Sequence, residues 1–202
     1  QAIEVDAEAI YQGNVSASKT LDIEGTYYPK DKKRNFDIKI ALENFKIRAF
    51  KPFVASVFSD VRGIASGTLN LRGVSSKPSL TGNLKLMRTG LGIGYINTLY
   101  SFANEIQFKE KSIIFNDITI YDSLGNTGLI NGAIKHDYLR DFELDLDILA
   151  NNLICLNTNK YQNDVFYGDA FASGLVKITG PFDNVSLEVT AKTEKGTDVF
   201  VP

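Results

Sequence analysis

The stretch Phe171-Ala-Ser-Gly-Leu-Val-Lys-Ile-Thr-Gly-Pro181 has an earlier counterpart in the same chain. Six residues at positions 65–67, 73 and 79–80 recur at 172–174, 180 and 186–187, all displaced by 107 positions. Between the glycines, apolar residues occupy every second position, which is typical of a β-strand with one apolar face. Each copy therefore predicts a strand, a turn with a glycine and a second strand. Because such a unit cannot bury its apolar face alone, the repeat predicts a long sheet in which similar units stack.

Composition limits the classes of protein that the chain can belong to. A length of 202 residues suits one large all-β unit, so we expect residues 1–202 to form a single domain. The net charge of −2, a pI near 5.5 and the lack of a basic run beyond 30–34 argue against nucleic-acid binding. No apolar run is long enough to span a bilayer as a helix. The chain begins at Gln1 directly in a strand pattern, which suggests a piece excised from a larger protein.

The clearest predicted strand is Asp141–Ile148, in which apolar and acidic side chains alternate. The four carboxylates on one face invite a calcium or glycosidase interpretation. Neighbours on one face of a strand are roughly 6.5–7 Å apart, which is too far for two of them to share a cation at bond lengths of about 2.4 Å. We therefore interpret the acidic row as a solvated face.

A change of period predicts one short amphipathic helix near residues 50–60. Apolar residues from Phe50 to Val61 follow at spacings of three and four, and Pro52 suits a first turn. One interpretation is a plug over the open end or edge of the sheet, and the other is a helix that lies on a membrane. The first is favoured.

Glycines at positions 90, 92 and 94 suggest a dinucleotide-binding loop, but their spacing does not give the required G-x-G-x-x-G pattern. They are better interpreted as one bare face of a strand, which lets either a ligand or another part of the backbone approach closely. Close packing of backbone is favoured.

No pattern predicts catalysis or a cofactor. The single His136 lies beside Asp137 in a predicted hairpin turn, and the single Cys155 lies in an alternating apolar segment. These two residues cannot supply the four ligands of a Cys/His zinc site, and no phosphate-binding loop is present. We expect a protein that is not an enzyme and that has no cofactor.

About a dozen one-sided strands supply a large apolar face with few elements to cover it. A sheet that curls without closing would leave an apolar trough suited to acyl chains or to the apolar side of another strand. The predicted lining of this groove consists of Phe36, Ile38, Ile40, Leu69, Leu71, Phe142, Leu144, Leu146, Ile148, Val176, Ile178 and Leu187.

Several motifs in the second half of the chain resemble one family. They are Tyr121-Asp-Ser-Leu-Gly-Asn126, the segments 131–142, 151–153 and 166–181, and the closing run Thr193-Glu-Lys-Gly-Thr-Asp-Val-Phe-Val-Pro202. Together they resemble the C-terminal domain of the TamB family (translocation and assembly module), within the AsmA-like superfamily and in particular its Bacteroidetes-type members. The resemblance is specific from about residue 50 onward.

The resemblance implies a β-taco, a long curved antiparallel-rich sheet folded into an open U with an apolar inside. It also implies a periplasmic segment of a Gram-negative protein whose absent N-terminal helix is anchored in the inner membrane, and an Omp85-type partner in the outer membrane. Two roles follow. One is transport of phospholipid between membranes by binding acyl chains in the groove, and the other is chaperone-like assembly of outer-membrane and autotransporter β-proteins by strand-edge pairing. A carbohydrate-binding β-sandwich is less favoured because the chain has no Trp.

Overall fold

The computed structural model describes residues 2–12, 17–55 and 58–202, and almost all of its regular structure is strand. Eleven strands follow one another in chain order across one antiparallel sheet, and β12 extends the sheet by pairing with β10 beside β11. The strands are β1 (Ile3–Gln12), β2 (Ala17–Tyr27), β3 (Phe36–Lys46), β4 (Asp60–Val74), β5 (Lys77–Ile93), β6 (Thr98–Lys109), β7 (Ser112–Tyr121), β8 (Thr127–Asp137), β9 (Arg140–Thr158), β10 (Tyr167–Pro181), β11 (Ser186–Thr193) and β12 (Asp198–Phe200).

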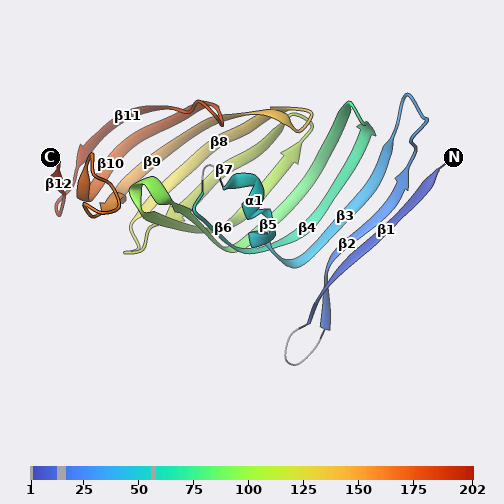
Figure 1. The fold of residues 1–202 in the computed structure, drawn as a ribbon, viewed down its shortest axis with the longest axis horizontal. Helices are drawn as coiled ribbons and strands as arrows, with labels where there is room; N and C mark the ends of the chain where they lie inside the picture. Colours follow the sequence, from blue (N-terminus) through green and yellow to red (C-terminus); the bar gives the residue numbers. More distant parts are fainter. Residues whose placement is uncertain (1, 13–16, 56–57) are drawn as a thin grey trace.

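The sheet is curved and does not close into a barrel. Figure 1 shows the strands running side by side from β1 at one end of the molecule to β11 at the other, with the chain termini at opposite ends. Within the described residues, β1 and β11 pair with each other nowhere and have no strand on their outer sides. The all-β prediction and the prediction of a taco-like open sheet are confirmed.

The sequence repeat is also a structural repeat. The bounds of β4 and β10 differ by the same 107 positions as the repeated residues. In the first copy, the Ser66 hydroxyl accepts a hydrogen bond of 2.9 Å from the backbone N–H of Asn44. In the second copy, the Ser173 hydroxyl accepts a hydrogen bond of 2.8 Å from the backbone N–H of Asn152. Both asparagines have a φ near +50°, and each lies where the register shifts at a β-bulge. The repeated serine therefore satisfies a backbone donor that the bulge removes from the ladder.

Glycines on the apolar face allow the sheet to bend. Gly132 of β8 has a φ of +131°, and a Cβ at this position would overlap the carbonyl oxygen of Asp145 on β9. Gly67 of the first repeat copy has a φ of +148° and a similarly close approach to Asn83 on β5. Such a close approach is possible only without a side chain, so these glycines act as kinks that curve the sheet.

The helical prediction for residues 50–60 is correct only in part. The structure has a 3-10 turn η1 (Ile47–Phe50) followed by one α-helical turn α1 (Lys51–Val54), and β4 already begins at Asp60. Residues 56–57 and the side chain of Phe53 lie outside what the structure describes. Val61, predicted on the helix, pairs instead with Leu91 of β5. Backbone pairing with β5, which begins with the 2.9 Å bond from the Ser59 N–H to the Gly92 carbonyl, ends the helix early.

The short helical segment covers one end of the sheet. Ile47 is buried, and Val54 and Phe58 pack against the hydrophobic core. These contacts support the interpretation of the segment as a plug.

The two ends of the strands differ in packing. We call the end with the turns at 28–35, 75–76, 110–111, 138–139 and 182–185 the tight-turn end, and the opposite end, with 47–59, 94–97, 122–126 and 159–166, the loop end. The most buried apolar side chains gather toward the loop end. They include Val61, Phe102, Ile118, Ile120, Ala150, Leu153 and Ile154.

Candidate functional site

One apolar row crosses ten strands in succession. Side chains of directly paired residues in an antiparallel sheet lie on the same face. The pairings connect, in order from β1 to β10, Ala7, Ile23, Ile40, Leu69, Gly82, Phe108, Ile113, Ile134, Leu144 and Gly180. Every member of the row is apolar, so one face of the sheet is hydrophobic over nearly its whole width.

The predicted lining residues in the first half of the chain join this row directly. Ile40 pairs with Leu69. Ile38 pairs with Leu71 in the next row on the same face, two residues nearer the tight-turn end. Phe36 follows on the same face and stacks on the Tyr27 ring with centroids 5.4 Å apart.

The predicted lining residues in the second half lie on the same face. Leu146 pairs with Ile178, and Ile178 pairs with Leu187 on β11. Ile148 pairs with Val176 in the next row. Phe142 and Leu144 continue the alternation of β9 toward the tight-turn end.

The register thus brings all twelve predicted residues to one face, and most of them are partly buried there. Two of the twelve differ from the others in exposure. Leu69 is buried, with 6% of its surface exposed, whereas Leu187 on the outermost strand is 64% exposed. Sequence patterns missed the members that connect the two halves, namely Leu80, Phe108, Ile113 and Ile134. Their alternation was visible, but nothing in the sequence specified which strands are neighbours.

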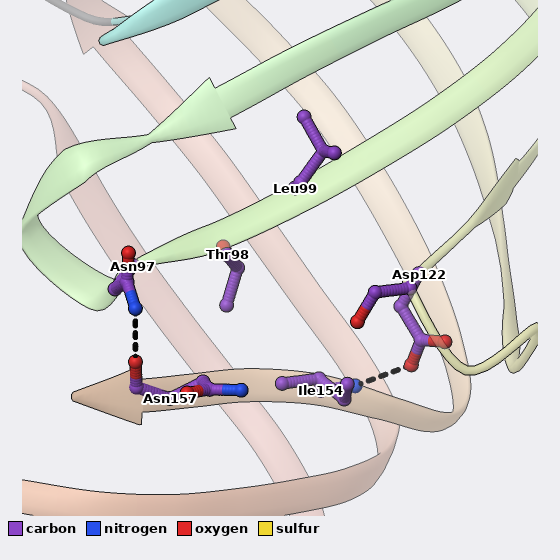
Figure 2. A pocket seen from close by; sticks show the side chains of 7 residues that line it. Asn97, Thr98, Leu99, Asp122, Ile154 and Asn157 are labelled. Carbon is purple, nitrogen blue, oxygen red and sulfur yellow. Dashed lines mark hydrogen bonds between the residues drawn. The ribbon is translucent and has the colours of Figure 1, made fainter.

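At the loop end, two strands that are not neighbours in the sheet are bonded together across the apolar face. The phenolic O–H of Tyr100 on β6 donates a 2.6 Å hydrogen bond to the Ile154 carbonyl on β9. The side-chain amide of Asn97 donates another, also 2.6 Å, to the Asn157 carbonyl, as Figure 2 shows. Because β7 and β8 lie between β6 and β9, these bonds require the sheet to curl toward its apolar face. We call this set of contacts the loop-end clamp.

Asp122 fixes the β7–β8 turn to the clamp. Its carboxylate accepts hydrogen bonds of 2.9 Å from the backbone N–H groups of Leu124 and Asn126, and one of 3.0 Å from that of Ile154. The last of these bonds is drawn in Figure 2. Burial alone would raise the pKa of Asp122, but the side-chain amide of Asn126 and the three backbone donors outweigh it and lower the pKa. The small pocket here, about 80 Å³, is lined in part by the residues of these bonds, Asn97, Asp122, Ile154 and Asn157.

A larger hollow also lies at the loop end, nearer the N-terminal edge of the sheet, where β1, β2, β3 and η1 meet. Its volume is about 580 Å³, which is within the usual range for small-molecule sites. The described lining residues are Ile10, Thr20, Asn44, Phe45, Lys46, Arg48 and Ala49. Phe45 pairs with Ala65, which is completely buried in the core, so the hollow is continuous with the apolar face.

The comparisons with known proteins agree with this architecture. Residues 116–202 match the family model described as the TamB C-terminal domain. This part of the chain is similar to the TamB C-terminal domain. The TamB match covers β7 from Asn116 onward and all of β8 to β12, so it includes Asp122 and the second repeat copy. No curated protein and no solved structure matches the chain.

Through residues 116–202 the chain is thus similar to a domain of proteins that take part in cell-envelope biogenesis. The match does not separate the Bacteroidetes type from other members, so that finer assignment stays a prediction. Among the described residues, no helix has the length and hydrophobicity needed to cross a bilayer.

Two polar residues of the TamB-like motifs, Asp122 and Thr197, have clear structural partners. The aspartate of Tyr121-Asp-Ser-Leu-Gly-Asn126 is the buried acceptor described above. Thr197, in the closing run, accepts a 3.0 Å bond from the Phe171 N–H and donates one of 3.1 Å to the Phe171 carbonyl. The motif thus connects the C-terminal segment to β10.

The two residues considered for catalysis are packed into the structure. His136 is 5% exposed, accepts a 3.2 Å bond from the Leu139 N–H at Nδ1 and contacts the Phe142 ring edge to face. The prediction that His136 lies in a hairpin turn was wrong, because β8 extends through Asp137 and the turn follows it. The half-buried Cys155 lies 3.3 Å from the Ala170 carbonyl, and burial raises the pKa of its thiol.

The acidic row of β9 and the glycines of β5 have ordinary structural roles. The carboxylates of 141, 143, 145 and 147 are exposed, and Asp145 forms an ion pair with Lys135, which agrees with a solvated face. Gly90 and Gly92 are buried in β5, where a Cβ would first meet side chains of Arg62 and of residues 59–60, so side chains of β4 and of the segment before it, rather than the predicted backbone, approach these glycines most closely. Gly94 departs from the prediction, because it begins the 3-10 turn η2 (Gly94–Ile96). Within the described residues, no group of three or more His, Cys, Asp or Glu could hold a metal ion.

Proposed function

We propose that the apolar face binds the acyl chains of phospholipids and that the protein carries them between the inner and outer membranes. The observation that supports this proposal is the apolar row that crosses ten strands without a polar residue. In this proposal residues 1–202 are one periplasmic domain of a Gram-negative TamB protein. The parent is anchored in the inner membrane by a segment outside this chain.

The mechanism is passive. Moving one methylene group from water to an apolar surface is favourable by about 0.8 kcal/mol, so a few contacted methylenes already hold a chain. Because every residue along the row is apolar, a chain can shift from strand to strand without crossing a charged barrier. The partly buried state of most lining residues leaves apolar area to be covered by a ligand. The headgroup remains at the open side of the curved sheet.

A matched pair of variants on β9 tests the apolar face. Leu146 points to the apolar face and pairs with Ile178, whereas Leu149 is 56% exposed. In Leu146→Asp a carboxylate interrupts the apolar surface and removes contact with two or three methylenes, a loss of about 2 kcal/mol or roughly 30-fold in affinity. Leu149→Asp adds the same charge to the same strand outside that surface and should bind normally.

The measurement is native mass spectrometry of the purified chain with phospholipid, together with extraction of phospholipid from vesicles. Circular dichroism confirms that both variants are folded. Equal lipid binding by wild type and folded Leu146→Asp would refute the proposal, as would the absence of any lipid bound to wild type.

A second function is supported by the exposed edge at the C-terminal end. β11 has no described neighbour on its outer side, and Leu187, Val189 and Phe200 are exposed there by 64%, 60% and 50%. Unpaired edges with alternating apolar side chains accept an additional strand. The added strand would come from an Omp85-type outer-membrane partner or a β-protein client. In this function Val199→Pro on β12 should weaken retention of the partner barrel in a pull-down more than Leu146→Asp does.

A further inference from the structure

The hollow between β1, β2, β3 and η1 has basic residues but no acid among its described lining residues. Its seven described lining residues include two cations, Lys46 and Arg48, and no acid, while the whole chain has a net charge of −2. Because Lys46 already takes part in an interaction of its own, Arg48 is the cation on which a binding site in this hollow depends.

The lining combines cations with an apolar wall. Ile10, Phe45 and Ala49 supply apolar surface, and Phe45 also contacts the ring of Phe50 with centroids 5.8 Å apart. The Arg48 guanidinium is a planar donor that matches phosphate oxygens, and the Asn44 amide is a further donor on the wall. A ligand that satisfies both parts of the wall carries an anionic group beside a hydrocarbon chain.

The apolar wall of the hollow adjoins the hydrophobic core, in which Ala65, Leu42 and Leu84 are buried. Phe45 faces Ala65, and the same face continues through Leu42 and Gly67 to Leu84 on β5. A headgroup bound at Arg48 would therefore lie beside this core, at the loop end of the sheet.

We propose that this hollow binds the phosphate-bearing headgroup of an anionic phospholipid, with the acyl chains lying against the apolar wall formed by Ile10, Phe45 and Ala49. This inference rests on the proposed binding of acyl chains and adds to it a preference for a net negative headgroup. In this proposal Arg48 contacts the phosphate.

The test compares two short-chain lipids below their micelle concentrations, dihexanoyl phosphatidylglycerol and the neutral dihexanoyl phosphatidylcholine, by NMR titration of the whole chain. We expect wild type to bind phosphatidylglycerol roughly fivefold more tightly, the size of effect expected from a partly exposed ion pair. Arg48→Glu should abolish this preference without changing phosphatidylcholine binding, and Arg48→Gln should reduce it. Arg140→Glu is the matched control, because it makes the same charge change at an exposed position of β9 and should retain the preference.

The outcomes separate the headgroup site from the groove. Equal binding of both lipids by wild type, or an unchanged preference in Arg48→Glu, overturns the headgroup site and leaves acyl-chain binding in place. Failure of both lipids to bind folded wild type overturns both proposals. Inorganic phosphate that binds as tightly as phosphatidylglycerol and is lost in Arg48→Glu assigns the hollow to free phosphate and overturns the lipid assignment.

Discussion

Replacement of Asp122 by alanine should destabilise the whole sheet, although the residue lies in a turn. Its carboxylate accepts four hydrogen bonds, three from backbone N–H groups and one from the Asn126 side-chain amide at 2.9 Å. The donor at Ile154 is the most important, because Ile154 is only 4% exposed and no water can replace the lost acceptor easily. The substitution removes the connection between the β7–β8 turn and β9.

The magnitude follows from these contacts. A buried donor without a partner costs about 1–3 kcal/mol, and hydrogen bonds to a charged acceptor contribute about 1.5–3 kcal/mol each. The turn donors can be hydrated after the substitution, so we expect a net loss of about 3–4 kcal/mol rather than the sum of four bonds. This loss is a large part of the stability of a typical domain.

Urea denaturation followed by circular dichroism measures this loss. Asp183→Ala is the matched control, because this aspartate lies exposed in the β10–β11 turn and should change the free energy of unfolding by less than about 0.5 kcal/mol. A loss below about 1 kcal/mol in Asp122→Ala, or one equal to the control, would refute the structural role of the carboxylate.

The same carboxylate makes stability depend on pH in a defined direction. Its pKa in the folded protein is below the ordinary value, so the folded state favours the charged form. The contribution is therefore complete above the ordinary carboxyl pKa and is lost as the pH falls through the lowered value. Asp122→Ala should remove this part of the acid sensitivity.

Three further predictions concern the fold. Ser66→Ala and Ser173→Ala should each cost about 1 kcal/mol in the free energy of unfolding, because each removes the same bond to a bulge N–H; unequal losses would contradict the structural equivalence of the repeats. Gly132→Ala should lower the melting temperature by several degrees, since its Cβ would overlap the Asp145 carbonyl; an unchanged value would exclude the kink. Burial raises the pKa of Tyr100 to about 12, so stability should fall as the pH rises from about 10 to 12, and Tyr100→Phe should lack this alkaline loss.

Local patterns were sufficient for the type of structure and for the apolar face. Alternation predicted the strand Asp141–Ile148, and the observed β9 contains it. The 107-residue repeat predicted two equivalent units, and β4 and β10 match in their bounds and in their serine-capped bulges. The helix near residues 50–60 was predicted too long, because its apolar spacing also fits the strand start at Val61, and pairing with β5 decided between the two.

The sequence by itself determined that the chain is a one-sided β-structure, because a period of two residues directly fixes which side chains share a face of a strand. It also determined the family resemblance, through motifs that can be recognised without coordinates. Only the tertiary structure decided that the apolar faces of ten strands join in one row, that Asp122 and Tyr100 clamp the loop end, and that Lys46 and Arg48 line a hollow. The physical reason is that these features depend on strand neighbours and on curvature, which arise from pairings between distant residues that no local pattern specifies.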